Sequence, residues 1–109
     1  MDDTWKTIGA LGARFDEHDR ERGVGREESV TLQILKIGEE FGEAAQAVIG
    51  AKGTNPRKGN SHTWGDVEAE VADVIVTAMV ALARMRPDAP AFFAAHLEQK
   101  SQRFLRPTQ

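Results

Sequence analysis

The sequence predicts an all-α fold of four helices, organised as one domain over residues 1–109. Two observations support this prediction. Apolar residues recur every three or four positions through most of the chain, and no segment shows the alternation with period two that is typical of strands. The chain is also long enough to form one hydrophobic core, and it shows no internal repeat and no second domain.

The first two predicted helices cover about residues 3–22 and 26–51. The first has apolar residues at helical spacing and ends before a pair of glycines. The second begins with two glutamates, which suit a helix N-terminus. Gly38 and Gly42 predict a place where another helix approaches closely. The stripe of the second helix that we expect to face the core consists of Ile34, Ile37, Phe41, Ala44, Ala45 and Val48.

The other two predicted helices cover about residues 66–86 and 87–104. Thr63 and Asp66, before the third helix, have the spacing of a capping box. Further apolar residues lie beside the main stripe, and a helix that is apolar nearly all round is buried on several sides. In so small a chain, this predicts a subunit interface. The main stripe consists of Val67, Val71, Val74, Ile75, Ala78 and Leu82.

Composition and charge exclude several classes of function. The net charge of −3 leaves no basic surplus, which argues against nucleic acid as a partner. The absence of cysteine excludes disulfides, zinc-thiolate sites and thiol nucleophiles. The longest apolar stretch is too short to span a bilayer, and the N-terminus lacks the features of a signal peptide. We therefore expect no membrane partner and a cytoplasmic location.

Paired carboxylates on two helices are the main candidates for a functional site. At about 100° per residue, Glu40 and Glu43 lie about 60° apart on one face of the second helix, beside its apolar stripe. Glu70 and Asp73 repeat this arrangement on the third helix. If the two helices pack by their apolar faces, the two acidic edges meet. Carboxylates brought together in this way need protons or metal ions, and oxygen ligands suit Mg²⁺ or Mn²⁺.

A simpler interpretation competes with this one, because acidic residues three positions apart on a helix usually form a solvated face. The second pair, also beside an apolar stripe, favours a site. Iron chemistry of the ferritin type is disfavoured, since the sequence lacks the Glu-x-x-His motifs that such bundles carry.

Other residues near the acidic pairs are candidates for contacts with a substrate. Lys36 either contacts a phosphate or pairs with Glu39 and Glu40 at helical spacing. The long loop before the third helix is rich in glycine and cations, and its Arg57 and Lys58 are candidate phosphate ligands. Trp64 either stacks on a base or packs the start of the third helix, and His62 either contacts phosphate or caps that helix.

The pattern Lys36-x-x-Glu39-Glu40-x-x-Glu43, followed by Glu70-x-x-Asp73, resembles the MazG-like all-α nucleotide pyrophosphohydrolases. That superfamily includes the dimeric dUTPases and related dCTP hydrolases. The resemblance covers about residues 32–82, and the four-helix layout extends it to most of the chain. It implies a four-helix bundle-like fold in a homodimer or homotetramer, with sites near subunit interfaces.

The resemblance also implies an activity and a set of ligands. The activity is Mg²⁺-dependent release of pyrophosphate from an NTP or dNTP, which leaves the monophosphate. The metal ligands map onto Glu40, Glu43, Glu70 and Asp73, and Mn²⁺ is a possible substitute for Mg²⁺. A water molecule is then the nucleophile, with Glu39 or Glu40 as candidate base. The chain lacks the tandem repeat of longer MazG proteins and a second set of acidic motifs, so the preferred base does not carry over.

Two alternatives remain open. One is a metal-dependent hydrolase of another phosphate ester or diphosphate that uses the same site. The other is a helical interaction module without catalytic activity, whose acidic edges bind a partner or tune solubility.

Overall fold

Residues 3–54, 56–57 and 59–105 are described by the structure, which is a computed structural model of the chain. Over these ranges it contains four α-helices and no β-strand, which confirms the predicted all-α class. The helices are α1 (Thr4–Glu21), α2 (Arg26–Lys52), α3 (Trp64–Met85) and α4 (Ala89–Leu105). Their bounds agree with the predicted ones to within about two residues. No helix in the described ranges is both long and apolar enough to cross a membrane.

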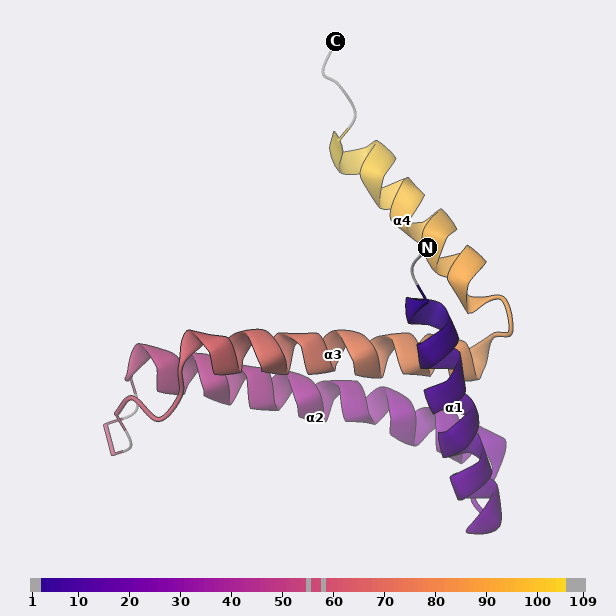
Figure 1. Ribbon diagram of the computed structural model, residues 1–109, viewed down its shortest axis with the longest axis horizontal. Helices are drawn as coiled ribbons and strands as arrows, with labels where there is room; N and C mark the ends of the chain where they lie inside the picture. The colour runs from indigo at the N-terminus through magenta and orange to yellow at the C-terminus, as the bar shows by residue number, and fades with distance from the viewer. Residues whose placement is uncertain (1–2, 55, 58, 106–109) are drawn as a thin grey trace.

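Helices α2 and α3 lie side by side as a long antiparallel pair, joined by the glycine-rich loop at one end (Figure 1). Near the other end of the pair, α1 crosses and packs on α3. Helix α4 contacts α3 and extends away from the pair (Figure 1). The structure is extended, with principal dimensions of 55 × 45 × 26 Å. The α2–α3 pair therefore provides most of the surface on which a site can be built.

Local signals explain where α2 ends and α3 begins. Gly53 follows α2 with a φ of 68°, a left-handed conformation that glycine adopts without steric cost. The predicted capping box before α3 is confirmed. The Thr63 hydroxyl accepts a hydrogen bond from the Asp66 amide at 3.1 Å, and the Asp66 carboxylate accepts one from the Thr63 amide at 2.9 Å. These bonds fix the start of α3, and so they fix how far Glu70 lies along the helix.

The hydrophobic core is small. Its buried apolar side chains are Ile8, Ala44, Ala47, Val67, Val80, Ala81 and Ala89. Helix α2 also buries Ser29, Gln33 and Gly50, so the face that it presents to the rest of the chain is narrower and more polar than predicted. Helix α1 approaches α3 at Gly12, where an added Cβ would lie 3.1 Å from Arg84 Cγ.

Part of the predicted core was wrong for the single chain. Phe41 on α2 is 66% exposed and Ile75 on α3 is 55% exposed, although both were expected to face the core. Gly38 and Gly42 also differ from the prediction, because outside the neighbouring backbone of α2 no heavy atom in the described part of the chain lies within 4 Å of a Cβ built at either position. The physical reason is that, within the described residues, α1 packs on α3 near one end of the α2–α3 pair and α4 extends away from it, so neither helix covers these side chains (Figure 1).

Candidate metal centre

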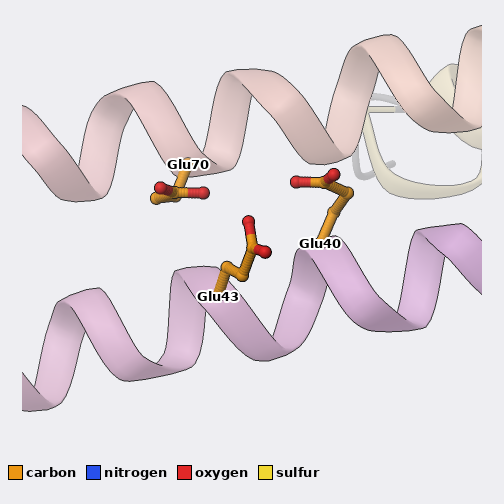
Figure 2. A group of neighbouring side chains, drawn as sticks. All are labelled: Glu40, Glu43 and Glu70. Atoms are coloured by element: carbon orange, nitrogen blue, oxygen red, sulfur yellow. The ribbon is translucent and has the colours of Figure 1, made fainter.

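Three glutamate side chains from two helices converge between α2 and α3. Glu40 and Glu43 come from neighbouring turns of α2, and Glu70 comes from α3, opposite them (Figure 2). Each contributes one carboxylate oxygen to a group whose members all lie within 4.8 Å of one another. The two acidic helix edges therefore meet, as the sequence pattern required, because both border the strip along which the helices pack. We call Glu40, Glu43 and Glu70 the glutamate cluster.

The glutamate cluster is partly withdrawn from water. The Glu40 side chain is only 15% exposed. Glu70 is half-buried, and its Oε2 atom is buried without a hydrogen-bond partner in the described part of the chain. A buried carboxylate oxygen without a partner raises the free energy of the folded state, unless a proton or a cation compensates for it.

The electrostatics of the cluster follow from this burial. Loss of hydration raises the pKa of Glu40 above its usual value, the negative charge of Glu43 raises it further, and the nearby ammonium of Lys36 partly offsets both effects. Loss of hydration likewise raises the pKa of Glu70, with the charges of Glu43 and Asp73 acting in the same direction. Carboxylates with raised pKa values are those that gain most from a bound cation, because the cation favours the charged form.

Asp73 lies at the margin of the cluster. It is exposed, and it is not one of the three residues whose oxygens lie within 4.8 Å of one another. Its negative charge nevertheless contributes to the raised pKa values of Glu40 and Glu70, so it is close enough to affect both groups. The structure thus brings together three of the four predicted ligands and leaves the fourth beside them.

Lys36 and Glu39 lie on the outer side of the same stretch of α2. Lys36 Nζ is 3.2 Å from Glu39 Oε1 and 3.9 Å from Glu40 Oε1, and the hydrogen bond that Lys36 donates to Glu39 raises the pKa of Lys36. The pairing interpretation of Lys36 is therefore the one seen in the structure, while a phosphate contact stays a prediction. The Glu39 side chain is 60% exposed and lies outside the glutamate cluster.

The loop residues are less closely connected to the cluster. Arg57 is exposed, Trp64 is 58% exposed at the first turn of α3, and Lys58 lies outside the described residues. His62 does not cap α3, since Thr63 does. Its Nδ1 is 2.9 Å from Ser61 Oγ, and its ring lies against Gly50, where an added Cβ would clash with Nδ1. An electrostatic interaction with His62 acts to lower the pKa of Glu70, which indicates that the ring lies near the cluster.

A second polar cluster was missed by the sequence analysis. The guanidinium of Arg84 on α3, whose side chain is 4% exposed, donates hydrogen bonds to Asp16 Oδ1 and Asp19 Oδ2 on α1, both at 2.8 Å. It also donates to Gln33 Oε1 on α2 at 2.7 Å and to the Ser29 hydroxyl. We call these five residues the Arg84 network. A lone cation within the apolar run of α3 was the signal that could have revealed it, because buried charges need partners.

The donor set of the glutamate cluster fits a hard divalent cation. It offers carboxylate oxygens alone, which Mg²⁺ and Mn²⁺ prefer, and one of these oxygens is buried without a partner. Comparisons of the chain with protein-family models, with curated proteins and with solved structures found no match. The interpretation of the site therefore depends on its geometry and on the sequence motif.

Proposed function

We propose that the chain is a Mg²⁺-dependent nucleoside triphosphate pyrophosphohydrolase of the MazG-like type. It would cleave an NTP or dNTP to the monophosphate and pyrophosphate. The observation that carries this proposal is the convergence of Glu40, Glu43 and Glu70 within 4.8 Å between two helices. A solvated acidic face, which is the simpler interpretation, would not require the buried and unpartnered oxygen of Glu70.

In this proposal the glutamate cluster holds the cation, with Asp73 completing the ligand set from the margin. When bound, Mg²⁺ neutralises phosphate charge and stabilises the departing pyrophosphate. The glutamates of the cluster come from α2 and α3, which pack along their length. The ligands are therefore held on rigid helices rather than on a loop.

The remaining roles belong to side chains beside the cluster. Hydrolysis adds water across the bond between the α and β phosphates, and the proton lost by the water goes to a carboxylate, Glu39 or Glu40. Glu40 lies in the cluster with a side chain 15% exposed, whereas Glu39 is more exposed and paired with Lys36. Lys36 is half exposed at the edge of the site, where it can exchange its carboxylate partner for a phosphate oxygen.

The proposal includes a homodimer or homotetramer. The single chain leaves large apolar side chains exposed on α2, α3 and α4, far more than its small core buries, and contiguous exposed apolar surface marks interaction sites. Among these side chains are Ile34, Phe41, Val71, Ile75, Phe92 and Phe104. Light scattering tests this point, and a monomer at working concentration would refute it.

The decisive experiment is a pyrophosphate-release screen over all NTPs and dNTPs, with Mg²⁺ and Mn²⁺ compared. Substitution of Glu40→Ala or Asp73→Asn is expected to abolish release without unfolding the protein. Glu68→Gln is the matched control, because Glu68 is an exposed carboxylate on the same helix as Asp73 and outside the cluster. Full turnover by the Glu40→Ala variant would refute the assignment.

The same screen, extended to other phosphate esters and diphosphates, separates the two alternatives. A hydrolase of another phosphate ester would release no pyrophosphate from any nucleotide, but it would cleave other substrates with the same dependence on Glu40. A non-catalytic module would show no turnover, and Mg²⁺ would not stabilise it against heat.

A further inference from the structure

A cavity of about 430 Å³ lies directly beside the glutamate cluster, between α1, α2 and α3. Glu40 and Lys36 line it at one end, and the Arg84 network lines it at the other through Arg84, Asp19, Ser29 and Gln33. Its volume lies within the range of about 300–1,000 Å³ that is usual for sites that bind small molecules. The cavity therefore begins where a phosphate chain bound at the cluster would end.

The walls of the cavity are apolar and incompletely covered. Phe15 of α1, Leu32 of α2 and Val76 of α3 line it and are 41%, 51% and 40% exposed. They come from three different helices, so they form a concave surface rather than a flat patch. A flat apolar ring that entered the cavity would remove these side chains from water, which is the main favourable contribution to binding in such sites.

The far end of the cavity is polar and held rigidly. Arg84, Ser29 and Gln33 are each at least 91% buried. Arg84 is held by hydrogen bonds to Asp16 and Asp19, Ser29 donates to Asp19, and Gln33 accepts from Arg84, so all three are fixed in place. The Gln33 amide also donates to the carbonyl of Thr77 at 3.3 Å. A polar group at the end of an apolar cavity fixes the orientation of a ligand, because a ligand without the matching group leaves it unpaired.

From this geometry we infer that the cavity binds the nucleoside part of the triphosphate substrate, with Asp19 selecting bases that carry an amino group. The inference rests on the proposed function, and it adds the direction in which the substrate lies. The phosphates lie at the glutamate cluster, and the base points toward α1, between Phe15 and Val76.

The preference for an amino group follows from the chemistry of Asp19. Its Oδ2 atom already accepts hydrogen bonds from Arg84 and Ser29. An ionised carboxylate accepts further hydrogen bonds and donates none. Cytosine, adenine and guanine present an amino group to such an acceptor, whereas uracil and thymine present an N–H flanked by two carbonyl oxygens, which the carboxylate repels.

The test uses the full chain with Mg²⁺ and two kinds of probe, measured by calorimetry. One probe is inorganic triphosphate, and the other is a set of α,β-methylene nucleoside triphosphates, which resist cleavage. Val76→Trp fills part of the cavity from α3 and removes no carboxylate of the glutamate cluster. It is expected to weaken binding of the nucleotide analogues at least tenfold and to leave inorganic triphosphate unchanged. Glu68→Trp is the matched control, because Glu68 is an exposed residue of α3 that lies outside the cavity and outside the exposed apolar surface.

The wild-type chain provides the second arm. The cytosine, adenine and guanine analogues are expected to bind at least tenfold more tightly than the uracil and thymine analogues. Equal or tighter binding of uracil would overturn the role of Asp19. If Val76→Trp changes both kinds of probe equally, changes neither, or alters only the oligomeric state in light scattering, the cavity does not bind the nucleoside. If wild-type chain binds no inorganic triphosphate with Mg²⁺, the proposed function itself fails, and this inference fails with it.

Discussion

Replacement of Arg84 by methionine removes a buried positive charge while keeping the aliphatic stem that packs against Gly12. The change leaves Gln33 and Ser29 buried without their guanidinium donor, and Asp16 and Asp19 without their counter-ion. Removal of one partner from a buried ion pair costs about 3–5 kcal/mol. The side chains of Asp16 and Asp19 are 34% and 25% exposed, so water can hydrate them once the guanidinium is gone. We therefore expect a loss of stability at the lower end of this range, about 3 kcal/mol.

For a domain of this size, a loss of about 3 kcal/mol lowers the melting temperature by about 12 °C or more. Urea unfolding followed by circular dichroism measures the loss, at one fixed protein concentration because association also stabilises the fold. The matched control is Arg86→Met, since Arg86 makes a similar pair with Asp88 at 2.8 Å but its side chain is 42% exposed. If Arg84→Met and Arg86→Met shift the midpoint equally, the Arg84 network does not hold the helices together.

Three further predictions follow from the same contacts. Glu70→Gln is expected to raise the melting temperature in EDTA, because it removes a negative charge from the cluster. The same substitution is expected to abolish the increase in melting temperature that Mg²⁺ produces in the wild-type chain. An unchanged increase would contradict the metal site. Without divalent cations, stability is expected to be highest in mild acid when urea midpoints are measured between pH 3 and 7. Hydrogen bonds from Ser29 and Arg84 lower the pKa of Asp19 below 3.8, so the stability that Asp19 contributes is lost as the pH falls through that lowered value. The pKa values of Glu40 and Glu70 are raised above 4.5, so the stability that these groups contribute is lost as the pH rises through the raised values. A stability that increases steadily to pH 7 would contradict this prediction. Gly50→Ala is expected to destabilise the chain by displacing the loop imidazole, whereas Gly9→Ala, with open space around its Cβ, should stabilise it by up to about 1 kcal/mol in the same melts.

The helices and their ends could be predicted from sequence because the responsible signals are local. The capping box of Thr63 and Asp66 and the left-handed Gly53 act within a few residues of the chain, and the structure shows both. The meeting of Glu40 and Glu43 with Glu70 was also predictable, since carboxylates that border an apolar stripe follow that stripe into the helix interface.

The choice of buried face could not be predicted in the same way. Phe41 and Ile75 belong to apolar stripes, yet the single chain leaves them exposed because the residues that would cover them are not supplied by its own helices. Helical periodicity shows that a face is apolar, but it does not show whether the same chain or a second copy covers it. The same holds for Gly38 and Gly42, because sequence does not show whether the helix that approaches them comes from the same chain or from a second copy.

The Arg84 network was not predicted because its members lie far apart in sequence. Asp16 and Asp19 are separated from Arg84 by 68 and 65 positions, and nothing local to either end indicates the pairing. What the sequence did offer was a single arginine inside an apolar helix, together with two aspartates three positions apart on another helix. A buried arginine needs carboxylate partners, and this requirement predicts that the helix with the two aspartates packs against the helix with the arginine.

The two polar clusters share one framework of helices, and the difference between them bears directly on function. In the Arg84 network, one cation meets two carboxylates at 2.8 Å, so the fold balances its buried charges with its own side chains. In the glutamate cluster, three carboxylates gather while Lys36 stays 3.9 Å from Glu40, and Glu70 Oε2 has no hydrogen-bond partner within the described residues. A purely structural cluster would be expected to resemble the first. The incomplete compensation of the second favours a cation from solution as the missing partner, and the cavity that joins the two clusters is where we propose that the nucleoside part of a substrate binds.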